Sequence, residues 1–492
     1  MSVGNDLRAL LRVRLLQLIA LTAFLAVIGG LALHYRFSII DLDIWWHLKV
    51  GDWIILHKAV PHTGILSRTA ANRPWVAYSW GYEVLLSLSC AWFGLVGVGV
   101  YGVLLTIGVA YVIYWMLLRL SGQFWLSLLG ASVTCAAFLY HGSPRPFFFS
   151  MMLFGVVMTL LLESHRDGKV ERLNWLPLIF LLWTNLHIQF IYGLFAIGML
   201  AGVCVVEQWL KARGACPDFL LTSRIPAPRM LIIFGLCVLA TLIGPNTYHS
   251  YVSVLEYSRS KFSYLVIVEL QPLSFRNIGE YIELLLAAAG FFAIGWRRKM
   301  DVFKILLLTA ACILGFRTMR DGWYLCMIAA AILFDFPAGT EPDQTESWME
   351  RAAMLPALAL VLVLFASSIG YNERGMDRAI SADYPVDAIN FLRRYQLPGP
   401  LYNDLAWGGF LTWYMPDYPV AIDGRNDLYG DELDQIFFHS QNGDTLPAAD
   451  PYLSESGIVL LHSEFPLAKM LAADSRFRLI YQDHLATVYV RR

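Results

Sequence analysis

The sequence predicts an α-helical polytopic membrane protein with a soluble C-terminal α/β domain. Of its 492 residues, 57% are hydrophobic and 15% are charged, whereas soluble domains carry about 25% charged residues. The mean hydropathy of +0.54 is too high for one water-soluble core, so the lipid bilayer is expected to be the main solvent. After about residue 371 the long apolar runs give way to short ones separated by Gly, Pro, Asn and Asp. That change is typical of a small soluble domain.

Apolar runs predict about eleven transmembrane helices. The first, Leu15 to Leu33, is long enough to be an uncleaved span. The second, 84–118, is too long for one straight span, and we expect a short interfacial helix that breaks near Gly94–Gly99. The other helices are expected at 124–140, 146–163, 174–186, 189–210, 230–244, 281–296, 303–316, 322–335 and 352–370. Several are shorter than the ~20 residues of a full span, which predicts kinked or partly buried helices around a central cavity.

The Lys and Arg residues predict the orientation of the chain. Cytoplasmic connections carry an excess of positive charge, and a cytoplasmic N-terminus satisfies this rule at Arg119 and within 166–172, 211–229 and 297–304. Eleven spans then place the C-terminus on the periplasmic or extracellular side. The expected domains are residues 1–371, a transmembrane domain with outer loops 37–83 and 245–280, and residues 372–492, a soluble non-cytoplasmic domain.

The C-terminal segment predicts strands and helices of a small α/β domain. The runs PVAID, GIVLLH, FRLIYQD and ATVYVRR are expected to be strands, and 385–395 and 464–473 are expected to be helices. The first of these strands would end in Asp423-Gly424-Arg425. A carboxylate and a guanidinium at a strand end often bind ligands, although Asp-Gly is also an ordinary turn.

The first outer loop carries the most informative polar pattern, Asp41-Leu42-Asp43-Ile44-Trp45-Trp46-His47. Carboxylates at a bilayer surface are costly unless they are solvated, paired or bound to a metal. In an extended segment Asp41 and Asp43 would point the same way and could converge on one cation or one reacting group. Asp43 and His47 would stack on one face of a helix. The alternative is structural, with Asp43 as the N-cap of an interfacial helix and the Trp pair as its anchor at the lipid headgroups.

Other polar residues stand at the predicted outer ends of helices. Glu83 begins the second helix, where it could face the same cavity as Asp43 or favour the helix dipole. The remaining candidates are Arg145, His187, Glu269, Arg317 and Arg320. Three arginines near one cavity would suit a lipid phosphate or pyrophosphate. Each residue alone is more often a snorkelling or interface residue.

Several functional classes lack their sequence signatures. There is no Walker loop, no nucleophile elbow, no zinc pattern and no dinucleotide fingerprint. The net charge of -1 gives no indication of a nucleic-acid partner.

The segment from Asp41 to Glu83 resembles the first outer loop of bacterial GT-C-type membrane glycosyltransferases, in which an acidic motif follows the first helix and an amphipathic helix comes next. The stretches DLDIWWHLKVGDWI, WTNLH and IDGRNDLYG together resemble one branch of that superfamily. Two motifs depart from relatives. The sequence has Asp-Leu-Asp instead of the Asp-Glu pair common in related mannosyltransferases, and it lacks the Trp-Trp-Asp motif of oligosaccharyltransferases.

The resemblance implies an enzyme of the bacterial inner membrane. Its donor would be a polyprenyl-phosphate-linked sugar from the membrane lipid, and its acceptor a glycan, a lipid or a protein. Asp41 or Asp43 would act as the base or hold a divalent cation, Mg or Mn, and Glu83 is a third catalytic candidate. Substrate-binding candidates are His47, Arg145, His187, Glu269, Arg317, Arg320, Asp423 and Arg425.

Two other classes stay open at this point. A transporter or flippase of a lipid-linked or anionic solute would also place polar residues in a cavity, but it should show internal repeats, and none is visible in the sequence. A non-catalytic protein of envelope polysaccharide assembly would need no cavity. Carboxylates that face bulk water would favour the last class.

Overall fold

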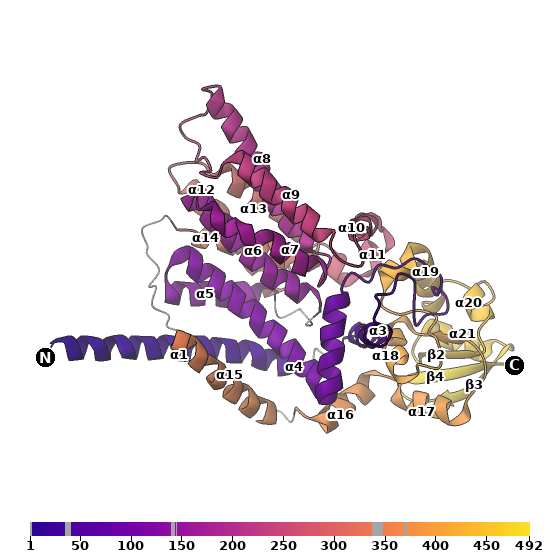
Figure 1. Ribbon diagram of the computed structural model, residues 1–492. Coiled ribbons are helices and arrows are strands. Elements are labelled where there is room, and N and C mark those ends of the chain that lie inside the picture. The colour runs from indigo at the N-terminus through magenta and orange to yellow at the C-terminus, as the bar shows by residue number, and fades with distance from the viewer. Residues whose placement is uncertain (1, 35–40, 139–142, 144, 337–347, 369–370) are drawn as a thin grey trace. The chain divides into compact units, whose positions relative to one another are not determined.

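The computed structural model describes residues 2–34, 41–138, 143, 145–336, 348–368 and 371–492. Residues 37–40 of the predicted first outer loop lie outside this range. The chain forms two compact units. Unit 1 comprises Met1–Tyr35, Gly102–Thr247 and Ile267–Ile369, and unit 2 comprises Arg36–Tyr101, Tyr248–Val266 and Gly370–Arg492. Figure 1 shows the helices and strands of both units.

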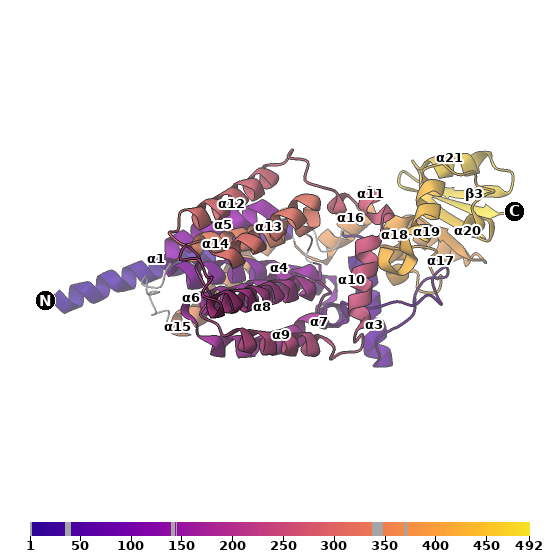
Figure 2. The ribbon, with the colours of Figure 1, turned by 90° about the horizontal axis from the view of Figure 1, so that it is seen from above.

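Unit 1 is a bundle of helices. Helix α4 (Trp80–Ser121) belongs to this unit from Gly102 onward. The other elements of unit 1 are α1 (Ser2–His34), α5 (Phe124–Phe138), α6 (Phe147–Asp167), η2 (Val170–Trp175), α7 (Leu176–Thr184), α8 (Phe190–Ala212), α9 (Ala227–Thr241), η3 (Val268–Leu270), α12 (Ile278–Gly295), α13 (Val302–Arg317), η4 (Met319–Asp321), α14 (Gly322–Phe334) and α15 (Trp348–Ser368). Helices α6, α8 and α9 run side by side (Figures 1 and 2). Each helix predicted from an apolar run is present within a few residues of its expected bounds, except that the first begins at Ser2 instead of Leu15.

The bundle is that of a multi-pass membrane protein. In the described part of the chain five helices are long and apolar enough to cross a membrane, namely Leu11–Leu33, α4, α6, α8 and α12. A sixth span results if the bent pair Met354–Ser368 and Glu373–Asp383 is counted as one. The predicted count of about eleven also includes shorter helices such as α5 and α9, and it stays a prediction.

Helix α4 breaks where the sequence predicts. The backbone at Gly94 has φ 64° and ψ -158°, which interrupts the helical path. Only glycine adopts a positive φ at little cost, so this residue separates the first turns of α4 from its long apolar part.

Unit 2 contains a four-stranded sheet of order β1-β2-β4-β3. Strand β1 (Leu401–Asn403) pairs in parallel with β2 (Ile458–His462), whereas β4 (Ala486–Arg491) pairs antiparallel with β2 and with β3 (Phe477–Gln482). Helices α17 (Val386–Tyr395) and α21 (Pro466–Ala473) flank the sheet in Figure 2. The other helices are α3 (Ile44–His57), α10 (His249–Arg259), α11 (Phe262–Val266), α16 (Glu373–Asp383), α18 (Leu405–Tyr414), α19 (Asn426–Gln441) and α20 (Pro451–Ser454).

Three of the four predicted strands are confirmed, and the strand predicted at PVAID is wrong. That segment makes only an isolated bridge between Ser67 and Val420. The side-chain amide of Asn403 accepts from Ala421 N at 2.8 Å and donates to Ile422 O at 2.8 Å. Because a side chain satisfies these backbone groups, the segment needs no neighbouring strand.

The segment after α1 shares a hydrophobic core with the C-terminal part of unit 2. Trp45 is fully buried, and its ring makes edge contacts with Tyr384, Phe410 and Tyr414 at centroid distances of 5.1–5.7 Å. Trp46 belongs to the same core as Ile422 and Leu428. The expectation that the two tryptophans anchor the loop at the lipid headgroups is therefore wrong, because they pack inside unit 2.

Candidate functional site

Asp41 and Asp43 lie in a tight turn directly before α3. Asp41 Oδ1 accepts a hydrogen bond from Asp43 N at 2.9 Å, and Asp43 Oδ1 accepts from Trp46 Nε1 at 3.0 Å. The backbone is turned, so the extended arrangement expected for the two carboxylates is not formed. Asp43 is the N-cap residue of α3, as the structural alternative expects, but its side chain makes no capping hydrogen bond to the helix. The turn instead fixes the Asp43 carboxylate against an indole.

His47 and Glu83 form a buried pair beside this turn. His47 Nδ1 lies 3.1 Å from Glu83 Oε1, and the two residues are 5% and 1% exposed. The pair joins the first turn of α3 to the first turn of α4. A Cβ at Gly51 would lie 2.1 Å from the Glu83 carbonyl oxygen, so the close approach of these helices requires glycine there. Within the described residues, Glu83 Oε2 has no hydrogen-bond partner.

Asp423 and Arg425 form a second buried ion pair. Arg425 Nε and Nη2 donate to Asp423 Oδ1 and Oδ2 at 2.9 and 2.6 Å, and both residues are 1% exposed or less. The guanidinium also lies over the Trp75 ring, 5.0 Å from its centroid, and donates to Ile65 O at 2.8 Å. Burial lowers the pKa of Arg425, but the Asp423 carboxylate more than offsets this and raises it. Arg425 is therefore a permanent cation inside unit 2.

The two sequence motifs meet at Gly424. A Cβ at this position would lie 2.1 Å from Asp43 Oδ1 and 3.4 Å from Trp46 Nε1. The Asp-Gly-Arg turn thus touches the acidic turn, although the two segments are far apart in the sequence. We call Asp41, Asp43, His47, Glu83, Asp423 and Arg425 the acidic site.

Sequence reasoning missed Asp427, which is a further part of the acidic site. Its carboxylate accepts from Trp75 Nε1 at 3.0 Å, and burial raises its pKa to about 6. Arg425 and Asp427 are the charged groups that act most strongly on Glu83. The run Asp-Gly-Arg-Asn-Asp was the only available signal, since nothing local distinguishes this aspartate from an exposed one.

The other predicted residues gather in unit 1. Glu269 lies between two guanidinium groups, with Arg145 Nη1 at 3.5 Å from Oε1 and Arg320 Nη2 at 3.4 Å from Oε2. Arg145 precedes α6, Glu269 is in η3 and Arg320 is in η4, so three separate connections meet here. Together with His187 and Arg317 these residues form what we call the arginine site.

His187 is held as a neutral ring in the arginine site. It lies in the turn between α7 and α8, with Nδ1 2.8 Å from Ser150 Oγ, which also accepts from Trp183 Nε1 at 2.8 Å. Burial, together with the positive charge of Arg320, lowers the pKa of His187 to about 3. An uncharged imidazole can orient a polar group but cannot neutralise a phosphate.

Asp321, which the sequence places with Arg317 and Arg320 between two predicted helices, also belongs to the arginine site. It accepts from Tyr192 Oη at 2.5 Å and from Thr318 Oγ1 at 2.6 Å. Burial raises its pKa, while Arg320 and Arg317 lower it. The Asp321 carboxylate is thus fixed by two hydroxyl groups and interacts electrostatically with both arginines.

No group of three or more His, Cys, Asp or Glu side chains among the described residues has the arrangement of a metal site. Magnesium is often held by only one or two carboxylates together with substrate phosphates. A role for Asp41 and Asp43 as ligands of Mg or Mn thus stays a prediction.

Comparison with known proteins identifies the fold. No protein-family model and no curated protein matches the sequence. The archaeal oligosaccharyltransferase AglB from Archaeoglobus fulgidus, solved with an inhibitory peptide and a dolichol-phosphate, matches with a TM-score of 0.52 at 11% identity, covering 90% of this chain and 69% of that one. ArnT from Cupriavidus metallidurans, bound to undecaprenyl phosphate, matches with a TM-score of 0.46 at 14% identity, covering 95% and 97%. The likeness to the oligosaccharyltransferase confirms the predicted GT-C-like fold.

Proposed function

We propose that this chain is a membrane glycosyltransferase that moves a sugar from a polyprenyl-phosphate carrier to an acceptor at the outer face of the bacterial inner membrane. Its fold is shared with an oligosaccharyltransferase whose structure holds a dolichol-phosphate. Because one fold can host many functions, the proposal depends on the site. The observation that carries it is the packing of Asp43 against Trp46 and Gly424, beside the buried His47–Glu83 pair.

The acidic site supplies the base. Asp43 removes the proton from the acceptor hydroxyl as its oxygen attacks the anomeric carbon of the donor. The hydrogen bond from Trp46 Nε1 orients the carboxylate, and the turn made by Asp41 fixes its backbone. The His47–Glu83 pair lies behind this turn and holds α3 against α4.

The arginine site supplies the charge for the leaving group. Arg145 and Arg320, which Glu269 holds in the free protein, bind the donor phosphate with charge-assisted hydrogen bonds. Arg317 adds positive charge and His187 a neutral polar contact. The bond between the anomeric carbon and the phosphate oxygen breaks as the new glycosidic bond forms, so the polyprenyl phosphate leaves with both bonding electrons. This single displacement inverts the anomeric centre.

Transfer by full-length protein in proteoliposomes tests the proposal. The probes are radiolabelled polyprenyl-phosphate hexoses and pentoses, and the readout is released polyprenyl phosphate together with label in the acceptor fraction. We expect release from at least one donor. Asp43→Asn should reduce it by roughly 10²–10⁴-fold, because the amide oxygen can still accept from Trp46 but no base remains. Asp417→Asn, at an exposed position of unit 2, is the matched control.

Two results would overturn the proposal in different ways. Wild-type turnover by Asp43→Asn would remove the catalytic role of this residue. If no polyprenyl phosphate were released above the level of empty liposomes, and the intact labelled lipid moved between leaflets, the protein would be a flippase and not a transferase.

A further inference from the structure

A groove of about 420 Å³ lies in unit 1 next to the turn between α12 and α13. It is far from the arginine site, since Met300 precedes α13 and Arg320 follows it, and a helix of 16 residues is about 24 Å long. Its walls are apolar at Phe219, Phe291, Ile294 and Met300, and its charged residues are Arg297 and Arg298. Among the described residues, no carboxylate lines it.

Backbone hydrogen bonds fix the two sides of the groove. Met300 N donates to Phe219 O at 2.8 Å, and Leu221 N donates to Met300 O at 2.9 Å. The connection between α8 and α9 is thereby joined to the connection between α12 and α13. The groove is therefore a built feature of unit 1.

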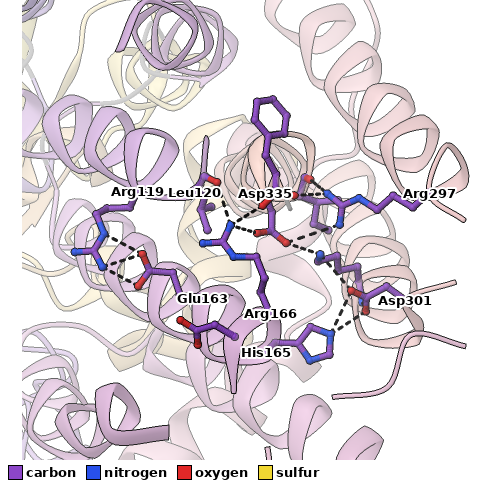
Figure 3. Close-up of polar contacts among 12 residues, drawn as sticks. Arg119, Leu120, Glu163, His165, Arg166, Arg297, Asp301 and Asp335 are labelled. Carbon is purple, nitrogen blue, oxygen red and sulfur yellow. Dashed lines mark hydrogen bonds and ion pairs between the residues drawn. The ribbon is translucent and has the colours of Figure 1, made fainter. Parts of the chain in front are cut away.

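Among the described residues, the polar network next to the groove holds more positive than negative charge, and Figure 3 shows its contacts. The Asp335 carboxylate is shared by Arg166 Nη1 at 2.9 Å, Lys304 Nζ, and Arg297 Nη1 at 3.8 Å. Arg297 also donates to the carbonyl oxygen of Asp335. The nearby Asp301 carboxylate is already engaged by His165 Nε2 and Lys304 Nζ, each at 3.2 Å. Within the described residues, the Asp335 and Asp301 carboxylates thus face three permanent cations, Arg166, Arg297 and Lys304.

Arg298 adds a cation that this network does not compensate. Its side chain is exposed, and within the described residues it makes no ion pair. Two large apolar side chains precede it and are exposed, Phe292 (66%) on α12 and Trp296 (80%) at the C-cap of that helix. Helix α12 is one of those long enough to cross a membrane, and exposed tryptophan is typical of the membrane interface.

We propose that this groove binds an anionic phospholipid, with its phosphate on Arg297 and Arg298 and its proximal acyl carbons on Phe219, Phe291 and Ile294. Guanidinium groups are weakly hydrated and match phosphate oxygens in pairs. Basic pockets beside transmembrane helices recognise anionic headgroups, and the predicted orientation places this end of α12 on the cytoplasmic side. The lipid is distinct from the proposed sugar donor, and the assignment does not depend on transferase activity.

Native mass spectrometry of the full-length protein in detergent tests the assignment. The probes are dioctanoyl phosphatidylglycerol, dioctanoyl phosphatidylcholine and inorganic phosphate. We expect one saturable phosphatidylglycerol molecule, with much weaker retention of phosphatidylcholine. Arg298→Gln should weaken binding about fivefold, as expected for one basic residue near a lipid phosphate. Lys299→Gln should leave it unchanged, because Lys299 is an exposed neighbour that does not line the groove.

Three results would overturn the assignment. Equal retention of phosphatidylcholine would show a purely apolar surface. Displacement of phosphatidylglycerol by equimolar inorganic phosphate would show a free-anion site. Equal losses of phosphatidylglycerol binding in Arg298→Gln and Lys299→Gln would show that the lipid is attracted by positive charge in general and not by the groove.

Discussion

Replacing Gly424 by alanine tests whether the Asp-Gly-Arg turn positions Asp43. The new Cβ would lie 2.1 Å from Asp43 Oδ1, whereas ordinary contact begins at 3.4 Å, so the carboxylate must retreat by roughly 1.3 Å. The obstacle is the end of a side chain, and the backbone of Gly424 does not lie in the left-handed region. The substitution should therefore move the carboxylate without unfolding unit 2.

A displacement of about 1 Å at a catalytic group can reduce the rate by roughly 10²-fold, which corresponds to about 2.7 kcal/mol of transition-state stabilisation. We expect kcat for the release of polyprenyl phosphate to fall by this factor. The donor KM should stay within twofold, because Asp43 is not assigned to the phosphate.

Gly202→Ala is the matched control, since nothing lies within 4 Å of its new Cβ. Thermal unfolding, followed by tryptophan fluorescence, should be unchanged in both variants. If Gly424→Ala turned over donor as fast as Gly202→Ala, the Asp-Gly-Arg turn would have no positioning role.

Three further predictions concern single charges. Arg320→Gln should raise the donor KM about tenfold, because a charge-assisted hydrogen bond contributes roughly 1.5–3 kcal/mol. An unchanged KM in steady-state assays would show that Arg320 does not bind the donor phosphate. Asp423→Asn should lower the free energy of unfolding by about 3–5 kcal/mol, because it leaves the buried Arg425 cation without its partner, and denaturant titration measures the loss. Burial and neighbouring carboxylates raise the pKa of Asp434 to about 8. The folded state then holds a proton that the unfolded state has lost, so between pH 4 and 8 stability falls by about 1.4 kcal/mol per pH unit from this group; Asp434→Asn should abolish that slope in thermal unfolding.

Much of the helical architecture could be predicted because it follows from local pattern. A span is a continuous apolar run, so α6, α8 and α12 stand near their expected residues. The break in α4 was also predictable, since glycines interrupt a run that exceeds one membrane thickness, and Gly94 adopts a positive φ there. Strands β2, β3 and β4 were equally visible as short apolar runs between turns.

The strand expected at 419–423 shows where local pattern fails. An apolar run predicts burial, but burial does not require a ladder partner. Here the side chain of Asn403 forms hydrogen bonds with the backbone of residues 421 and 422. Strand β1, and not residues 419–423, pairs with β2 in the sheet. No spacing within PVAID could reveal an amide that lies many residues earlier.

Most residues of the acidic site and the arginine site were candidates from the sequence, but their geometry was not predicted. Because tryptophan is common at the membrane interface, the sequence led us to expect Trp45 and Trp46 there. Trp45 is instead enclosed by Tyr384 and Phe410 of the C-terminal domain. These long-range contacts have no signature in a single sequence, and they also decide the surroundings of Asp43.

The packing of Trp45 makes the C-terminal domain part of the acidic site. The indole is fully buried only because C-terminal aromatic rings surround it, and removing a core aromatic typically costs about 3–5 kcal/mol. The acidic turn that precedes Trp45 can therefore keep its shape only while this domain is folded. Gly424 adds a direct contact to Asp43 from the same domain. The two motifs that resemble glycosyltransferases, one after the first helix and one near the C-terminus, thus form one structural element, and a substitution in either should disturb the same carboxylate.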